Sequence, residues 1–217
     1  AFIHNDFETK FAVPRQSGIA PVESEIIFEK EYCDINAVRG LEEFSHIWLI
    51  WGFSENIREK HSLTVRPPRL GGNVRLGVFS TRSPFRPNNL GLSCVELSGC
   101  KMKNGKLTLT VRGADLMNGT PIYDIKPYIK YSDCKENAVS GFVEKEEFGI
   151  LEVEIPEKLL NTVPKEKREA LRIILENDPR PAYQNDSDRE YGFTYAGLEI
   201  KFKVIEKRLE VLDIYAD

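Results

Sequence analysis

Apolar and polar residues alternate with a period of two in three segments, which predicts β-strands that bury one face. These segments are Leu107–Val111, Leu151–Ile155 and Ile200–Val204. Two further segments, Ile47–Trp51 and Val74–Phe79, are apolar enough to predict more deeply buried strands. Because glycine, proline and asparagine turns separate these short strands, the pattern favours an antiparallel barrel or sandwich over a doubly wound sheet.

Helical periodicity is limited to two segments. Residues Ile35–Phe44 predict a short helix with a polar face. The stronger pattern runs from Pro164 to Glu176, with the proline at the first helical position and Asp178–Pro181 as the stop. The apolar face of this helix is expected to consist of Ala170, Leu171, Ile174 and Leu175.

The order of these elements predicts a mainly β protein with two domains. A polar stretch at 133–137, followed by Gly141, places the boundary. Residues 1–138 would form a small antiparallel β-barrel, and residues 139–217 a small C-terminal α/β domain. A chain of 217 residues with 41% hydrophobic content is long enough for this division.

The sequence disfavours several functional classes. The four cysteines form no C-x-x-C pair and the three histidines are scattered, so no metal site is expected. A disulfide framework is not expected in so large a chain without a secretory segment. No G-x-G-x-x-G follows a strand, which disfavours a Rossmann nucleotide site. The apolar run Ile47–Trp51 is too short for a bilayer and no secretory segment opens the sequence, so we expect a soluble cytoplasmic protein.

Charge is distributed unevenly along the chain. The formal net charge is -4, yet the stretch from Lys60 to Val95 has no acidic residue. Its basic residues are Lys60, Arg66, Arg69, Arg75, Arg82 and Arg86. Guanidinium groups on rigid Pro/Gly loops are well suited to bind carboxylates, phosphates or a polyanion. We therefore expect any polyanionic partner to bind at this stretch.

Three segments carry candidate chemistry. Arg82–Gly91 places two arginines beside prolines; the alternative is a surface loop whose arginines pair with nearby carboxylates. Asp115–Pro121 predicts a fixed loop, and Asp124, Lys126 and Tyr128 after it would share one face of a strand. An ordinary solvated strand with an Asp–Lys pair explains that face equally well. Lys10–Ile19 has the Pro and Gly positions of a loop whose backbone amides approach a ligand.

These segments together resemble a known family, the tRNA adenine-N6 methyltransferases of the TrmO type. The similarity covers nearly the whole chain. The motifs that carry it are Pro14–Gln16, Leu41–Trp48, Val65–Asn73, Gly77–Asn88, Asp115–Pro121, Asp124–Tyr128 and Asp178–Tyr183.

The resemblance implies a small β-barrel enzyme that uses S-adenosylmethionine. Members of the family methylate the N6 nitrogen of threonylcarbamoyladenosine beside the anticodon of a threonine tRNA, and they work as homodimers with the cofactor near the subunit interface. The implied partners are thus a tRNA, bound through its anticodon stem-loop, and a second copy of the chain.

The resemblance also implies site residues. The cofactor contacts would be Ser17, Gly18, Ile19, Ser54, Glu55, Arg82, Leu92, Ala114, Asp115 and Leu116. The residues expected to line the same pocket and act in catalysis are Asp124, Lys126, Tyr128 and Arg86. Our hypothesis is that Arg82 or Arg86 binds a carboxylate of the cofactor or of the modified base, and that Asp124 accepts the N6 proton.

Two alternatives stay open. The barrel could be a non-catalytic module that binds RNA or a small anion through its arginines. It could also be a methyltransferase of the same fold that acts on another acceptor. Saturable binding of S-adenosylmethionine distinguishes the first alternative, and the mass of the treated tRNA distinguishes the second.

Overall fold

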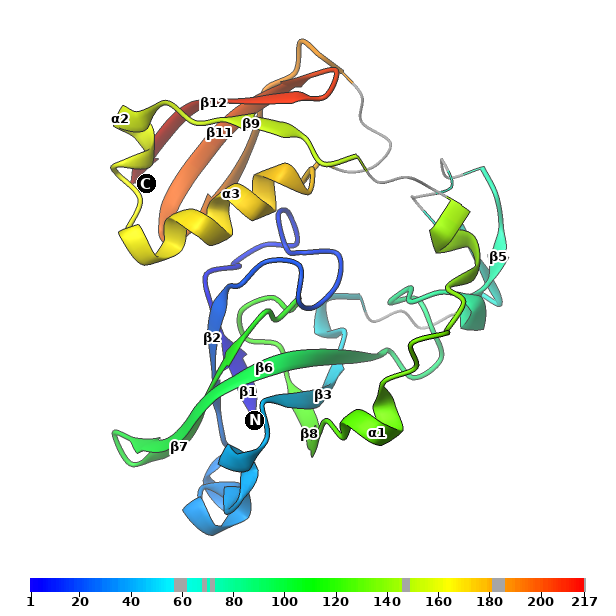
Figure 1. The fold of residues 1–217 in the computed structure, drawn as a ribbon, viewed down its shortest axis with the longest axis vertical. Helices are drawn as coiled ribbons and strands as arrows, with labels where there is room; N and C mark the ends of the chain where they lie inside the picture. Colours follow the sequence, from blue (N-terminus) through cyan, green and yellow to red (C-terminus); the bar gives the residue numbers. More distant parts are fainter. Residues whose placement is uncertain (57–61, 68–69, 71–72, 146–148, 181–185, 217) are drawn as a thin grey trace.

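The computed structural model describes residues 1–217 except 57–61, 68–69, 71–72, 146–148, 181–185 and 217. Figure 1 shows two sheets, one from the first part of the chain and one from the last, with helix α3 (Arg168–Glu176) lying between the second sheet and the first. Within the described residues, no helix is long and apolar enough to cross a membrane.

The first sheet is a six-stranded antiparallel sheet in the order β1-β2-β7-β6-β3-β8. It curls into a half-barrel, and a single β-bridge between Phe2 and Pro121 joins its two edges. The predicted antiparallel barrel is confirmed in this form. The strands are β1 (Phe2–His4), β2 (Glu23–Ile27), β3 (His46–Gly52), β6 (Leu90–Lys103), β7 (Lys106–Arg112) and β8 (Ile122–Pro127).

The alternation read from the sequence decides which face of this sheet is buried. In β3 the side chains of Ile47, Leu49 and Trp51 point into the barrel core, and the residues between them face outward. The turn between β6 and β7 has positive φ at both Asn104 (51°) and Gly105 (75°). Positive φ at two successive turn residues is the conformation that a tight hairpin requires, so the hairpin forms where an Asn-Gly pair stands.

The predicted buried strand at 74–79 is wrong. Only Leu76–Gly77 forms a strand, β5, which pairs with β4 (Thr64–Val65), and a 3-10 helix follows at Val78–Ser80. Val78 is buried, but the Phe79 side chain is 73% exposed. The apolar residues here therefore do not share one buried face, although their composition suggested it.

The predicted helix at 35–44 is also wrong. Two 3-10 turns, Ile35–Val38 and Leu41–Glu43, occupy this segment. Gly40 separates them with a left-handed φ of 83°, which interrupts any continuous helix. Other short helices are α1 (Lys130–Asp133), α2 (Glu157–Leu160) and 3-10 turns at Lys30–Tyr32, Ser54–Asn56 and Gly141–Lys145.

The second sheet is four-stranded and mixed, in the order β10-β11-β12-β9. Its strands are β10 (Tyr191–Tyr195), β11 (Leu198–Ile205), β12 (Arg208–Ala216) and β9 (Glu152–Glu154), of which only β12 and β9 are paired in parallel. Helix α3 buries the predicted residues Ala170, Leu171, Ile174 and Leu175. Pro164 does not begin α3, because it caps a 3-10 turn, Lys165–Lys167, that precedes the helix. The small α/β unit is confirmed.

The loop between β1 and β2 connects the two sheets. Four of its side chains, Phe7, Ala12, Ala20 and Val22, belong to the same buried cluster as α3 and strands β10 to β12. The Phe7 ring is 1% exposed and lies 6.0 Å from the ring of Tyr195. The N-terminal segment thus completes the core of the C-terminal unit, and the boundary between residues 138 and 139 stays a prediction.

We predict that Phe7→Ala lowers the free energy of unfolding by about 3–5 kcal/mol, because it removes a fully buried ring and leaves a cavity in the second core. Phe2→Ala, at a ring that is 40% exposed, is the control and should lose much less. Urea unfolding of both variants measures the difference. Equal losses would contradict the assignment of the loop to this core.

Candidate anion-binding cleft

A cleft of about 1620 Å³ lies between residues 81–89, the loop after β1 and the end of α3. We call residues 81–89 the arginine loop, because they contain Arg82 and Arg86. Segments 79–87, 139–143 and 177–180 form parts of its wall. Of the described residues that line it, Asp178 is the only acidic one. The cationic ones are Lys10, Arg15, Arg66, Arg75, Arg82, Arg86 and Arg180. Such an excess of positive charge in a concave site attracts anions.

The arginine loop is held by hydrogen bonds between its own residues. The Thr81 hydroxyl accepts from the Ser83 amide at 3.3 Å, the Ser83 hydroxyl accepts from the Phe85 amide at 3.2 Å, and the Asn89 side chain donates to the Pro84 carbonyl at 2.7 Å. Asn89 has a φ of 45°, which asparagine tolerates better than most residues. Both predicted arginines of this loop therefore line one cleft on a fixed backbone.

Arg82 and Arg86 are held differently. Arg82 donates to the side-chain oxygen of Gln16, from the loop after β1. Arg86 donates to the Thr81 carbonyl at 3.0 Å and lies 6.0 Å from the centre of the Phe79 ring. Each guanidinium has five N–H donors, so donors remain for a ligand.

Asp115 forms a polar centre beside this cleft. Its carboxylate accepts from the Ser93 hydroxyl at 2.5 Å, and Ser93 accepts from the Trp51 indole N–H at 2.9 Å. Burial raises the pKa of Asp115, while the Ser93 hydrogen bond, the charge of Arg82 and the amide of Ser17 oppose that rise. The side chain thus links loop 17–19 and Arg82 to the barrel interior.

Glycines bring two of the predicted cofactor loops together. The Gly18 amide donates to the Gly113 carbonyl at 2.8 Å. Gly113 has a φ of 85°, and a Cβ on it would lie 3.2 Å from the Gly18 Cα. Ser17, Gly18, Ala114, Asp115 and Arg82 are consequently neighbours. Ala114 and Leu116 are fully buried and do not line the cleft.

The remaining predicted cofactor residues are more dispersed. Ile19 lines the cleft. Ser54 and Glu55 are exposed in a 3-10 turn, where the Glu55 carbonyl accepts from Lys10 Nζ at 3.0 Å. Leu92 is 57% exposed and lies on the outer face of β6, away from Ser93 and the barrel core.

Three of the predicted catalytic residues do not line this cleft. Asp124, Lys126 and Tyr128 lie on or just after β8, on the outer face of the barrel. Asp124 and Lys126 form an exposed ion pair at 3.3 Å, and the Tyr128 ring lies 5.8 Å from that of Trp48. In the strand register, Ile50 of β3 stands between Asp124 and Leu92. These predicted residues therefore share a second surface within one chain.

Several contributing residues were not predicted as site residues. Arg15 and Gln16 belong to a motif of the resemblance, but nothing in the sequence shows that Gln16 meets Arg82. Asp178 and Arg180 were read as a helix stop. Ser93 was missed, although a serine within the apolar part of β6 could have signalled a buried polar partner.

The donor set of the cleft fits S-adenosylmethionine. Arg82 and Arg86, which line the cleft, offer guanidinium groups to its carboxylate. Asp115, beside the cleft, offers side-chain oxygens to its amino group. The close approach of Gly18 to Gly113 leaves backbone amides of the loop near these side chains. Across the described ranges, no group of three His, Cys, Asp or Glu side chains could hold a metal ion.

Fold and cleft together define a single-sheet β half-barrel with a cationic cleft, joined to a small α/β unit. The chain belongs to the TrmO family. The family model described as the tRNA-methyltransferase O N-terminal domain matches residues 2–134, and that of the TrmO C-terminal domain matches residues 150–217.

Individual relatives match over nearly the full length. The chain is 37% identical to a tRNA (adenine(37)-N6)-methyltransferase of Escherichia coli, over 96% of this chain and 93% of the relative. It is 38% identical to a putative S-adenosylmethionine-dependent methyltransferase of Pseudomonas aeruginosa, over 98% and 94%. A crystal structure of TrmO from Pseudomonas aeruginosa superposes with a TM-score of 0.77 at 30% identity, covering 99% of this chain and 96% of that one.

We predict that Asp115→Asn gains stability relative to the wild type as the pH rises from about 4 to about 7. Because burial raises the pKa of Asp115, folding favours its neutral form, and the wild type loses that contribution as the carboxyl ionises. Asparagine cannot ionise. Urea unfolding of both proteins across this pH range gives the difference, and a constant or opposite trend would contradict this account.

Proposed function

We propose that this protein is an S-adenosylmethionine-dependent methyltransferase that modifies the N6 nitrogen of threonylcarbamoyladenosine beside the anticodon of threonine tRNA. The observation that carries the proposal is the cationic cleft lined by Arg82 and Arg86, in which Arg82 contacts Gln16 and lies near Asp115. The printed activity of the Escherichia coli relative supports the same reaction. The tRNA substrate would place this reaction in the cytoplasm.

The cleft would bind both partners through their negative charges. Arg82 and Arg86 would bind carboxylates in a bidentate manner. The further cations Arg66 and Arg75 would contact phosphates of the anticodon stem-loop. S-adenosylmethionine supplies an electrophilic methyl group on its sulfonium. The task of the chain is then to orient the adenine, exclude water and remove a proton.

We assign the proton acceptor as Asp124. Methylation forms a bond from N6 to the methyl carbon and breaks the sulfur–carbon bond, and one N6 proton must leave. The Asp124 carboxylate lies 3.3 Å from the Lys126 ammonium, on the strand that ends beside Tyr128. Lys126 and Tyr128 would orient the base around this carboxylate.

We also propose a homodimer that uses the outer face of β3, β6 and β8. This face holds unusually exposed apolar side chains for a single chain. Leu90, Leu92 and Tyr123 are 43%, 57% and 64% exposed, and the β3 residues between them are apolar. An apolar patch of this kind is typical of protein interfaces. Dimerisation here would bring Leu92 and Asp124 to the subunit boundary, where the resemblance expects the cofactor.

A non-catalytic RNA- or anion-binding module and a methyltransferase with another acceptor are the competing functions. Isothermal titration with S-adenosylmethionine gives no saturable heat for the module. Mass spectrometry of nucleosides from threonine tRNA, with and without the threonylcarbamoyl group, tests the acceptor. We expect one added methyl group on the modified tRNA alone; methylation of neither tRNA would contradict the proposal.

We predict that Asp124→Asn slows turnover on the order of 10²–10⁴-fold, since an acceptor of the proton is lost, while affinity for S-adenosylmethionine stays unchanged. The matched control is Glu210→Gln, which removes the carboxylate of another exposed strand pair, Lys203–Glu210 at 3.5 Å. Single-turnover methylation and titration calorimetry provide the two measurements. Full turnover in Asp124→Asn would exclude this role.

We predict that Leu92→Asp converts a dimer to a monomer, because a charge would be buried in the apolar interface. Ile205→Asp is the control, at a side chain that is 49% exposed on the other sheet, and it should stay dimeric. Sedimentation velocity measures the mass of each. A wild type that sediments as a monomer, or a dimeric Leu92→Asp, would contradict the proposed interface.

A further inference from the structure

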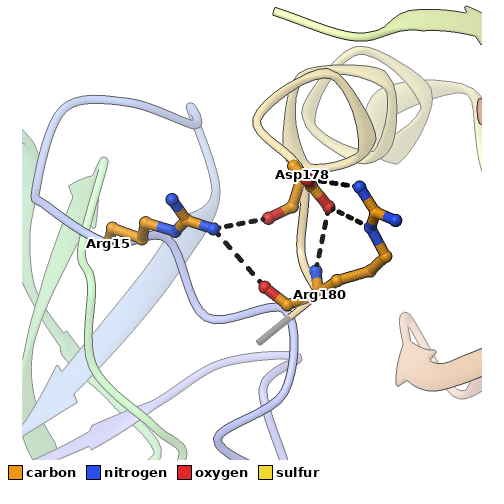
Figure 2. A network of polar contacts seen from close by, with 3 residues as sticks. All are labelled: Arg15, Asp178 and Arg180. Atoms are coloured by element: carbon orange, nitrogen blue, oxygen red, sulfur yellow. Dashed lines mark hydrogen bonds and ion pairs between the residues drawn. The ribbon is translucent and has the colours of Figure 1, made fainter. Parts of the chain in front are cut away.

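Arg15 connects the loop after β1 to the turn that follows α3 (Figure 2). Its guanidinium donates from one nitrogen, Nη2, to the Asp178 carbonyl at 3.0 Å and to the Arg180 carbonyl at 3.4 Å. In the chain, Arg15 precedes Asp178 by 163 positions and Arg180 by 165 positions. Both ends of the contact line the cleft.

The turn that receives Arg15 is held rigidly. Asp178 has a left-handed φ of 48°, and its carboxylate accepts from Arg180 at Nε and Nη2, each at 2.8 Å, and from the Arg180 amide at 3.2 Å. Figure 2 shows the two side chains on the far side of the turn from Arg15. Arg180 is only 8% exposed and lies 5.8 Å from the centre of the Tyr191 ring. The two carbonyls are therefore preorganised, since a partly buried bidentate pair fixes the backbone that bears them.

Arg15 belongs to the same loop as the predicted cofactor contacts Ser17, Gly18 and Ile19. We call residues 12–20 the cofactor loop. The next residue, Gln16, accepts from Arg82. The residue after it, Ser17, lies near Asp115, and its backbone amide opposes the rise of the Asp115 pKa. A path of direct contacts thus runs from the end of α3 through Arg15 and Gln16 to Arg82.

The remaining anchors of this loop lie at its ends. Ala12 and Ala20 are buried in the second core, whereas Gly18 is exposed. Between these buried ends, two described contacts join the loop to other segments through its backbone or through Arg15. They are the contact of Arg15 with the turn and the Gly18–Gly113 hydrogen bond at 2.8 Å. An exposed loop with few such bonds samples other conformations when one of these bonds is lost.

We propose that Arg15 is a positioning residue, and that the Asp178–Arg180 turn of the C-terminal unit is the part of the fold that fixes the cofactor loop. The proposal rests on the proposed function, because it assigns this loop to S-adenosylmethionine. It gives the C-terminal unit a role in the cofactor site: Arg15 holds Gln16 and Ser17 where they meet Arg82 and Asp115.

Arg15→Ala tests the proposal against a matched arginine. Arg168 also donates to two main-chain carbonyls, of Val163 at 2.9 Å and of Asn161 at 3.3 Å, but it does not line the cleft. We expect Arg15→Ala to weaken S-adenosylmethionine binding about 10-fold in titration calorimetry, and Arg168→Ala to leave it unchanged. Arg15→Lys should recover most of the loss, since an ammonium can donate to both carbonyls.

Hydrogen–deuterium exchange of the free protein provides a readout without cofactor. The amides of Ser17 and Gly18 should exchange about 10-fold faster in Arg15→Ala than in the wild type, and at the wild-type rate in Arg168→Ala. Equal exchange and equal affinity in the two alanine variants would overturn the proposal. A wild type without saturable binding would instead contradict the proposed function, and the exchange rates would still decide whether Arg15 holds the loop.

Discussion

The arrangement of this protein depends on the burial of the β1–β2 loop in the core of the C-terminal unit. Phe7, Ala12, Ala20 and Val22 contribute apolar surface to a core that α3 and the second sheet form. Because the hydrophobic effect is the dominant favourable contribution to folding, this burial fixes the loop against the C-terminal unit. The loop then presents Arg15, Gln16 and Ser17 between the two units, where the cleft is formed.

Charge separation is the second constraint. The chain is acidic overall, at a formal net charge of -4, yet the described lining of the cleft has a single carboxylate. That carboxylate, Asp178, is occupied by Arg180. Arg15, Arg82 and Arg86 donate to carbonyl or amide oxygens, and Arg75 donates to the Thr64 hydroxyl. These neutral partners hold an arginine in place without neutralising its charge. The cleft thereby keeps a positive potential for an anionic ligand.

Two surfaces, rather than one, carry the residues that the resemblance pointed to. Ile19 and Arg82 line the cleft, and Ser17, Gly18 and Asp115 lie beside it. The outer face of the barrel carries Leu92, Asp124 and Lys126 across neighbouring strands. A homodimer, as proposed, gives a physical reason for both surfaces to belong to one enzyme, because an apolar strand face exposed in one chain becomes buried in two.

The sequence by itself determined the elements whose cause is local. Alternation with period two identified β7, β9 and β11, Asn104–Gly105 identified the hairpin, and the apolar face of α3 was read correctly, since side-chain periodicity and turn conformation depend on near neighbours. Local composition predicted the wrong element at two segments. At 74–79 a two-residue strand and a 3-10 turn replace the predicted buried strand. At 35–44 the left-handed Gly40 separates two 3-10 turns where a helix was predicted.

Only the tertiary structure decided which distant residues meet. The contacts of Arg82 with Gln16, of Ser93 with Asp115, and of Arg15 with the turn after α3 join positions that no spacing rule connects. The same holds for the placement of Asp124 on the outer face, which follows from the curl and register of the first sheet. Packing of one core against another sets these distances, and a linear pattern does not contain that information.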